Sequence, residues 1–247
     1  MTLTNRDVIT EHAVQLVAFR GQQYDPMGSA IQLRPNLLLT ARHVFDDYFA
    51  TLDGRPFTDG IEARFGCWAM HELVDGRIFR LAVTRIWAAP WSDLAILLTE
   101  SIPGRDPMRV AMSMSPPRVG SNVFAFGYHD GKVDVDGDTI TIARRGSTSV
   151  GSVVEVHNER RDNFSITWPC FRVDARFDGG MSGGPVFNEA GQVCGLVCAC
   201  MPPDEPGGTY VSYVTSLWPM LAIELDVPRE GQPTGSYPTY DLARTGM

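Results

Sequence analysis

The chain of 247 residues is predicted to be an all-β protein whose strands fall into two sets. Three observations support this prediction. The sequence contains many short apolar segments separated by turn-forming residues, regular helical spacing is weak, and a proline-rich stretch at 102–120 divides the segments into two groups. Hydrophobic residues make up 44% of the chain, which is enough for a sizeable core. Many short strands in one chain are typical of sandwiches and barrels.

The first group of predicted strands lies before residue 100, and the second follows the proline-rich stretch. Strands of the first group cover 13–19, 29–35, 36–41, 62–69, 78–87 and 94–99. Those of the second group cover 122–128, 132–135, 138–144, 151–158, 164–168, 170–175, 184–188, 192–199 and 209–214. Asp136-Gly137 predicts a hairpin turn, because this pair tolerates positive φ angles. Helical spacing is confined to 4–13, the few residues after His43, and 214–225.

Charge and hydropathy exclude two classes of partner. The net charge of −8 argues against a nucleic-acid partner bound by bulk electrostatics. No apolar run approaches the roughly 18 residues needed to cross a bilayer. The first residues also lack the basic start and long apolar segment of a signal peptide. We therefore expect a cytoplasmic protein that binds neither nucleic acid nor membrane.

The five cysteines predict buried thiols rather than disulfides or a metal site. Cys194, Cys198 and Cys200 have the same parity in QVCGLVCAC, so on a strand they share one face. Free cysteines behave as small hydrophobic residues, and an odd number of them fits a reducing compartment. No paired Cys-x-x-Cys or histidine cluster completes a zinc site. We expect no metal and no cofactor.

Three polar residues are candidates for chemistry. His43 follows an apolar strand and a small-residue turn in LLLTARHVFDD, Asp93 precedes an apolar strand in WSDLAILLTE, and Ser182 is surrounded by glycines in FDGGMSGGPVF. Alone, each has an ordinary explanation as a structural histidine, a turn-capping carboxylate or a glycine turn. Together, their order and separations of 50 and 89 residues match one of the few chain orders in which a histidine, an aspartate and a serine form a catalytic triad.

The same motifs resemble those of trypsin/chymotrypsin-fold serine peptidases, most closely the HtrA-like and other bacterial intracellular branches. TARHV is similar to the family's Thr-Ala-x-His motif, SDLAIL to its aspartate motif, and GMSGGPVF to its Gly-Asn/Asp-Ser-Gly-Gly-Pro motif. The resemblance covers residues 10–225. It implies two six-stranded antiparallel β-barrels and a short C-terminal helix. The expected domains are 1–115, with His43 and Asp93; 116–228, with Ser182 and the helix; and a flexible tail at 229–247.

The resemblance also implies a role for each residue of the site. His43 would be the general base and then the general acid, Asp93 would orient the imidazole, and Ser182 would be the nucleophile. The backbone N–H groups of Gly180 and Ser182 would form an oxyanion hole, with Met181 between them. Many relatives carry an aspartate in place of Met181, which pairs with a newly cut N-terminus. A thioether cannot form that ion pair, so we expect no activation by such a cleavage.

Substrate-binding residues are implied by position within the family. Arg176 and Phe177 fall at the base of the primary specificity pocket, Cys198, Ala199 and Cys200 form one wall, and Gly207-Gly208 the other. Arg176 at the pocket floor would favour an acidic substrate side chain. The alternative is that Arg176 points to solvent and Phe177 makes a shallow apolar pocket. Cys198 also occupies a position where relatives often have a serine that touches the aspartate.

The resulting hypothesis is a serine endopeptidase that cleaves protein or peptide substrates. Two alternatives remain open at the level of sequence. One is a catalytically silent binding module with the same fold. The other is a signalling effector protease that an activating protein partner switches on by ordering the oxyanion loop.

Overall fold

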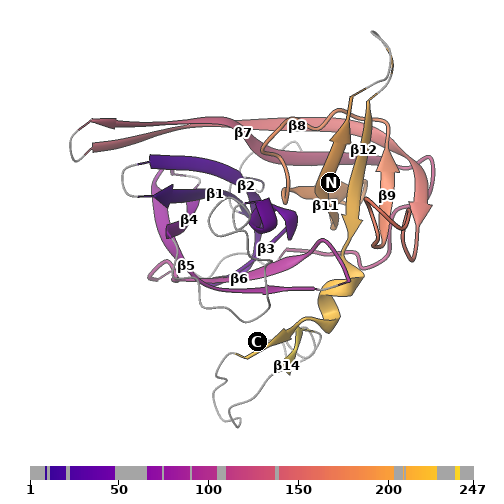
Figure 1. Ribbon diagram of the computed structural model, residues 1–247, viewed down its shortest axis with the longest axis horizontal. Coiled ribbons are helices and arrows are strands. Elements are labelled where there is room, and N and C mark those ends of the chain that lie inside the picture. The colour runs from indigo at the N-terminus through magenta and orange to yellow at the C-terminus, as the bar shows by residue number, and fades with distance from the viewer. Residues whose placement is uncertain are drawn as a thin grey trace.

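The computed structural model describes residues 9, 12–20, 23–47, 66–73, 75–89, 91–104, 110–136, 139–202, 208, 210–226 and 237–239. Twelve of the strands in this part of the chain form two closed barrels, six strands in each. The two barrels lie side by side (Figure 1). The predicted pair of six-stranded antiparallel barrels is therefore confirmed.

The first barrel is formed by six strands in the first half of the chain. They are β1 (Ala13–Arg20), β2 (Gln23–Arg34), β3 (Leu37–Thr40), β4 (Gly66–Glu72), β5 (Ile78–Ala88) and β6 (Ala95–Thr99). Their spatial order is β1-β2-β3-β6-β5-β4, and pairing of β1 with β4 closes the barrel. All neighbouring strands are antiparallel. This order places β3 and β6, which are distant in sequence, next to each other.

The second barrel repeats this architecture. Its strands are β7 (Asn122–Asp136), β8 (Thr139–His157), β9 (Cys170–Val173), β10 (Pro185–Asn188), β11 (Val193–Met201) and β12 (Val211–Ser216). Their order is β10-β11-β12-β9-β8-β7, and the barrel closes between β10 and β7. The strands predicted separately at 122–128 and 132–135 form one strand with a register shift between His129 and Lys132.

Strands β7 and β8 form a long hairpin that passes beyond the second barrel and runs alongside β1 and β2 of the first (Figure 1). The predicted turn at Asp136-Gly137 is consistent with this pairing, although Gly137 lies outside the described residues. Arg144 on β8 joins the hairpin to β4, because its guanidinium bonds the carbonyl oxygen of Met70 at 3.1 Å and pairs with the carboxylate of Glu72. The hairpin thus bridges the two barrels.

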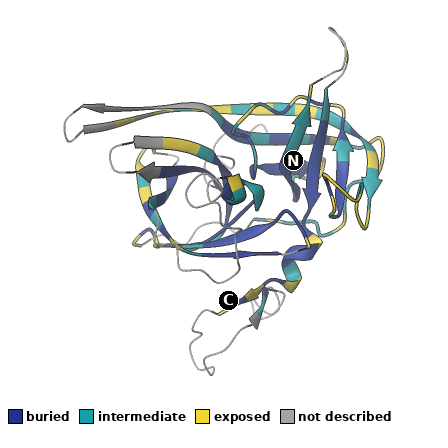
Figure 2. Ribbon diagram, in the orientation of Figure 1, coloured by how far each residue is buried: buried dark blue, intermediate teal, exposed yellow. Residues whose placement is uncertain are grey.

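Apolar side chains fill each barrel and the space between them. Figure 2 shows that the strands of both barrels carry many buried residues. The cluster between the barrels, which we call the shared layer, contains side chains from both. Its buried members include Ile31, Leu39, Trp87, Leu94 and Ile96 of the first barrel, Phe187, Val193 and Leu196 of the second, and Leu217, Met220, Ile223 and Leu225 after β12. Because burial of a large apolar side chain contributes about 1.5–3 kcal/mol, this layer holds the barrels in one arrangement.

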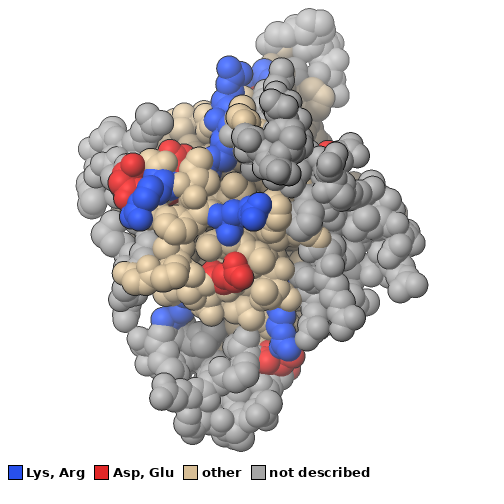
Figure 3. All heavy atoms as spheres, turned by 90° about the vertical axis from the view of Figure 1, so that its left-hand side faces the viewer, with Lys and Arg blue, Asp and Glu red and all other residues tan. Residues whose placement is uncertain are grey.

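The five cysteines are free thiols, and four of them are buried, as predicted. Burial raises the pKa of Cys67 to about 12, so this thiol is uncharged at neutral pH. On the face shown in Figure 3, basic and acidic side chains of the described residues lie in scattered groups separated by uncharged surface. None of the helices in the described part of the chain is long and apolar enough to cross a membrane.

The predicted short C-terminal helix is only a 3₁₀ turn, Trp218–Ala222. Pro219 lies at its start, no side chain caps it, and Ile223 that follows is extended. An isolated turn of this kind has too few backbone bonds to continue as an α-helix. The chain instead forms β13 (Glu224–Leu225), which pairs with β14 (Tyr237–Pro238). Tyr237 and Pro238 of the predicted tail are therefore paired, and Thr239 bonds the carbonyl of Ile223. The rest of 229–247 lies outside the described residues.

Candidate active site

His43 and Asp93 meet because their strands are neighbours. His43 lies three residues after β3 ends at Thr40, and Asp93 lies two residues before β6 begins at Ala95. In the antiparallel pair of strands, Thr40 is opposite Ala95, so the end of β3 and the start of β6 share one edge of the barrel. Residues 43–47 are helical, as the sequence predicted for the few residues after His43.

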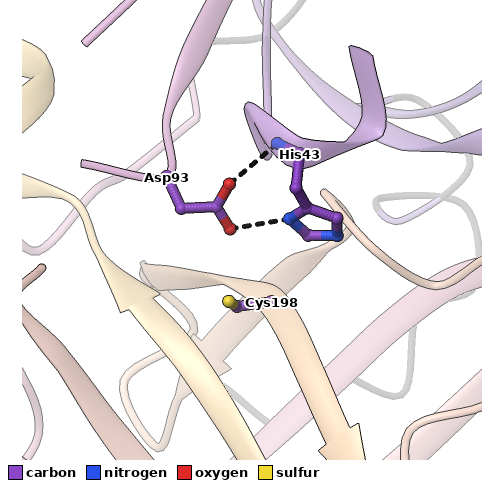
Figure 4. Close-up of side chains that lie close together, drawn as sticks. All are labelled: His43, Asp93 and Cys198. Atoms are coloured by element: carbon purple, nitrogen blue, oxygen red, sulfur yellow. Dashed lines mark hydrogen bonds and ion pairs between the residues drawn. The ribbon is translucent and has the colours of Figure 1, made fainter. Parts of the chain in front are cut away.

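Two hydrogen bonds join the histidine to the aspartate (Figure 4). The backbone N–H of His43 donates to Oδ1 of Asp93 at 2.9 Å, and the ring Nδ1 lies 2.8 Å from Oδ2. The side chain of Asp93 is buried, whereas that of His43 is 30% exposed. Because both carboxylate oxygens are engaged by the same residue, the imidazole is fixed in position as well as in orientation. Its other nitrogen, Nε2, is the one left for chemistry.

Strands of the second barrel complete the surroundings of Asp93. The hydroxyl of Thr215 on β12 donates to Oδ2 at 3.5 Å. The thiol of Cys198 on β11 lies within 4.8 Å of the Asp93 carboxylate, and burial and the charge of this carboxylate raise the pKa of the thiol well above its ordinary value. Cys198 therefore stays protonated and can donate its S–H. Sequence reasoning missed Thr215, because no local motif marks it.

Asp93 also controls the charge of His43. Burial is the largest single influence on the pKa of His43 and lowers it, but the charge of Asp93 and the hydrogen bond to it outweigh burial. With smaller contributions from Asp47 and Asp46, the pKa is raised above its ordinary value of 6.5. The imidazole is thus a stronger base than an unpaired histidine at the same depth.

The glycine-rich loop that carries Ser182 is a series of tight turns before β10. Met181 N–H donates to the carbonyl of Asp178 at 3.1 Å, and Gly184 N–H donates to that of Met181 at 2.9 Å. Gly180 and Gly183 have positive φ angles of 91° and 80°, which side-chain-bearing residues rarely adopt. Within the described residues, the N–H groups of Gly180 and Ser182 donate to no backbone carbonyl, whereas those of Met181, Gly183 and Gly184 do.

The Ser182 loop packs directly against the strand that leads to His43. The carbonyl oxygen of Ser182 accepts a hydrogen bond of 2.8 Å from the N–H of Ser29 on β2. A Cβ atom on Gly183 would lie 2.2 Å from both the carbonyl oxygen of Ser29 and Oγ1 of Thr40, and 2.9 Å from the N–H of Ala41. The structure thus brings the Ser182 loop beside the segment that ends in His43. Among the described residues, the hydrogen bonds do not include one between Ser182 Oγ and the His43 ring.

Replacing Gly183 with alanine is expected to lower the free energy of unfolding by about 2–5 kcal/mol, since the left-handed conformation and overpacking both oppose a side chain there. Gly76 is the matched control. It has a similar φ of 83°, but a Cβ at that turn would meet nothing within 4 Å, so Gly76→Ala should cost only about 1–2 kcal/mol. Urea denaturation followed by tryptophan fluorescence measures both values. Equal losses would show that the space around Gly183 is not restricted.

Met181 lies in the core of the second barrel. Its side chain is fully buried in an apolar cluster with Ala125, Phe177 and Val186. Its sulfur lies 3.2 Å from the backbone N of Asp178, so the thioether packs inside the loop. The side chain is an apolar anchor in this structure and carries no charge for an ammonium group to pair with.

The residues predicted to bind substrate are placed as follows. The Arg176 side chain is 62% exposed, pairs with Asp178 at 2.9 Å and lies over the ring of Tyr210 at 5.2 Å. Phe177 is buried. Cys198 is buried, Ala199 and Cys200 are half-buried, Gly208 is exposed, and Gly207 lies outside the described residues. Arg176 thus lies at the surface, as in the alternative in which it points to solvent, and Phe177 packs in the apolar cluster of the second barrel.

One group of potential metal ligands occurs among the described residues. Donor atoms of His43, Asp93 and Cys198 all lie within 4.8 Å of one another. However, Nδ1 and Oδ2 are 2.8 Å apart, whereas two ligands of one tetrahedral zinc ion are separated by about 3.3 Å. The thiol would also have to lose its proton despite its raised pKa. The geometry therefore fits a proton-transfer pair better than a zinc site.

Two β-barrels, a buried aspartate that holds a histidine at their junction, and a glycine-rich serine loop beside it define a double-barrel peptidase. The chain belongs to the trypsin-like peptidase domain family, whose sequence model matches residues 28–196. The family acts on protein substrates. No curated protein matches the sequence in a search of such proteins.

Solved structures share the fold at low sequence identity. The structure of Deg5 is 21% identical with a TM-score of 0.54, covering 77% of this chain and 80% of that one. The active form of Rv3671c protease from M. tuberculosis is 17% identical with a TM-score of 0.51, covering 84% and 77%. The MamO protease domain from Magnetospirillum magneticum is 16% identical with a TM-score of 0.53, covering 85% and 93%. At these identities the likenesses show the fold alone, which is that of a trypsin-like peptidase domain.

Proposed function

We propose that the protein is a serine endopeptidase that hydrolyses peptide bonds in proteins through a His43-Asp93-Ser182 triad. The observation that carries this proposal is the doubly hydrogen-bonded pair of His43 and the buried Asp93, next to the loop of Ser182. Such a pair supplies a base whose orientation is fixed and whose charged form is stabilised. A histidine with only a structural role would not need a buried carboxylate that is hydrogen-bonded to both its backbone N–H and its ring.

Acylation begins when Ser182 Oγ attacks the carbonyl carbon of the substrate and His43 Nε2 accepts the hydroxyl proton. Asp93 keeps the proton on Nδ1 and stabilises the imidazolium that forms. The tetrahedral intermediate then collapses, the C–N bond breaks, and His43 gives its proton to the leaving amine. The product is an ester between the substrate's acyl group and Ser182.

Deacylation repeats these steps with water. His43 accepts a proton from the water as its oxygen attacks the ester carbon. It then returns the proton to Ser182 Oγ when the ester bond breaks. The peptide leaves as a carboxylic acid, which ionises at neutral pH, and the enzyme is restored.

The N–H groups of Gly180 and Ser182 are the proposed donors to the oxyanion in both halves of the reaction. Their lack of a backbone acceptor among the described residues supports this role. The positive φ of Gly180 lets the loop turn without a side chain that would obstruct the substrate. Loss of one oxyanion donor typically lowers the rate by about 10²–10³-fold.

A fluorophosphonate probe tests the proposed nucleophile without a known substrate. Ser182 Oγ should attack the phosphorus, the P–F bond should break, and fluoride should leave as His43 takes the hydroxyl proton. We expect the wild type to be labelled at Ser182, Ser182→Ala not to be labelled, and Ser113→Ala to be labelled as the wild type is. Ser113 is a suitable control, because its hydroxyl bonds the carbonyl of Ser115 in a loop. Folded wild type that fails to react would instead indicate a silent binding module.

A further inference from the structure

A second serine, Ser29 of β2, is fully buried at the junction of the two barrels. Its hydroxyl donates to the carbonyl oxygen of Gly180 at 3.1 Å and accepts from the N–H of Tyr128 on β7 at 2.8 Å. Its N–H donates to the carbonyl of Ser182 at 2.8 Å, and its carbonyl accepts from the hydroxyl of Thr40 at 2.7 Å. Every polar group of Ser29 is therefore bonded to a segment that borders the site.

Two of these bonds fix the peptide groups around the proposed oxyanion donors. A peptide group is planar, so holding its carbonyl oxygen also fixes the direction of the N–H that follows. The bond to the Gly180 carbonyl fixes the peptide between Gly180 and Met181. The bond to the Ser182 carbonyl fixes the peptide between Ser182 and Gly183. The N–H of Ser182 lies between them. In a loop with several glycines, such anchors remove rotations that the backbone would otherwise be free to make.

The other two bonds connect this loop to the rest of the site. Thr40 ends the strand that leads to His43, so Ser29 joins the segment that carries the base to the loop that carries the nucleophile. Through the N–H of Tyr128, Ser29 also fixes β7 against Gly180. The backbone there is already close, because a Cβ on Gly180 would lie 2.8 Å from the carbonyl oxygen of Tyr128.

We propose that Ser29 is a positioning residue that holds the Ser182 loop in its catalytic arrangement in the single chain, without a cut N-terminus or an activating partner. This inference rests on the proposed function of the loop. The apolar anchor at Met181 holds the inner side of the loop, and Ser29 holds the side that faces the first barrel. Together they take the place of the ion pair that many relatives form between an aspartate at the position of Met181 and a newly cut N-terminus.

The test compares Ser29→Ala with Thr239→Val. The hydroxyl of Thr239 is also buried and donates to a backbone carbonyl, that of Ile223 at 2.7 Å, but it lies outside both barrels. With a fluorogenic peptide amide chosen from a peptide library, Ser29→Ala should lower kcat by about 10²-fold, close to the loss of one oxyanion donor, and change KM much less. Thr239→Val should leave kcat unchanged. Ser29→Cys, which keeps a weaker donor and acceptor, should fall between Ser29→Ala and the wild type.

Two further readouts separate positioning from general destabilisation. The acid midpoint of the pH profile of kcat/KM should be the same in Ser29→Ala and the wild type, because none of the four bonds of Ser29 reaches His43 or Asp93. Amide hydrogen exchange across 178–184 should be faster in Ser29→Ala than in the wild type and unchanged in Thr239→Val. Placing both variants in the Ser182→Ala background makes the exchange measurement independent of hydrolysis.

The outcomes distinguish the two proposals. Unchanged exchange across 178–184 in Ser29→Ala, or a kcat equal to that of the wild type, overturns the role of Ser29 and leaves the peptidase standing. If exchange is faster in Ser29→Ala but the folded wild type is not labelled by the fluorophosphonate, the proposed chemistry is overturned. The role of Ser29 in holding the loop then stands.

Discussion

Replacing His43 with alanine is expected to lower kcat by about 10⁶-fold, because the chemical steps depend on one residue that both accepts and donates the proton. The remaining hydrolysis would come from substrate binding and the oxyanion donors alone. The fold should survive, since the His43 side chain is 30% exposed and its only described side-chain partner is Asp93. Initial rates on fluorescently labelled casein, with circular dichroism to confirm folding, measure this effect.

His157→Ala is the matched control for this substitution. His157 ends β8 and lies 3.3 Å from the carboxylate of Glu155, so it has a carboxylate partner but no contact with the Ser182 loop. The kcat of His157→Ala should stay within about twofold of the wild-type kcat, as expected for a substitution outside the site. If His43→Ala kept more than about a thousandth of the wild-type kcat, its assignment as the proton-transfer residue would be wrong.

Asp93→Asn is expected to lower kcat by about 10⁴-fold and to move the pH profile. An amide in place of the carboxylate can hold the ring in the wrong tautomer, with the proton on Nε2, where it blocks attack. The pH effect follows from the raised pKa of His43. The imidazole must be uncharged to accept a proton, so wild-type activity should rise with pH through a midpoint above 6.5. Without the charge of Asp93, burial is opposed only by the smaller contributions of Asp47 and Asp46, and the midpoint should fall below that of the wild type.

The pH dependence of kcat/KM, measured on the same peptide amide for the wild type and Asp93→Asn, gives both values. Asp75→Asn serves as the control, because Asp75 is an exposed carboxylate paired with Arg77 at 2.8 Å. Its profile should match that of the wild type. A midpoint in Asp93→Asn that equals or exceeds the wild-type midpoint would contradict the electrostatic role of Asp93.

The barrel strands and the His43–Asp93 pair could be predicted from sequence because their signals are local. The strand predicted at 164–168 was wrong, because the backbone N–H groups of 164–166 bond the carboxylate of Asp162 and not a neighbouring strand. The apolar runs before His43 and after Asp93 mark strand ends, and the motifs around them fix where the chemistry lies. What the sequence does not show is that Thr40 pairs with Ala95, which is the contact that brings the two side chains together. The closed order of the barrel decides that pairing, and it depends on contacts across the whole first half of the chain.

Ser29 could not be predicted, because its partners are far away in the sequence. The residues that its hydroxyl contacts lie 151 and 99 positions away, and neither belongs to a pattern around Ser29 itself. The family motifs around His43, Asp93 and Ser182 do not identify which carbonyl the hydroxyl of Ser29 meets. Arg176 shows a similar limit, because the direction of its side chain also depends on the ring of Tyr210, which is distant in the sequence.

The expected C-terminal helix is present only as a short 3₁₀ turn, for a related reason. The segment after β12 has apolar residues at helix-like spacing, and Leu217, Met220 and Ile223 are indeed buried. However, they are buried because they pack into the shared layer between the barrels. A short turn followed by an extended chain places apolar residues three positions apart on one side just as one face of a helix would.

The shared layer has a consequence for how inactive variants are understood. The proposed base and nucleophile belong to different halves of the molecule, so the packing between those halves, together with the hydrogen bonds across their junction, determines how far apart they are. A substitution at Phe187 or Leu196 can therefore tilt one half against the other by a fraction of an ångström and stop the reaction in a protein that is still fully folded. In this architecture, a residue whose loss abolishes turnover need not take any part in the chemistry.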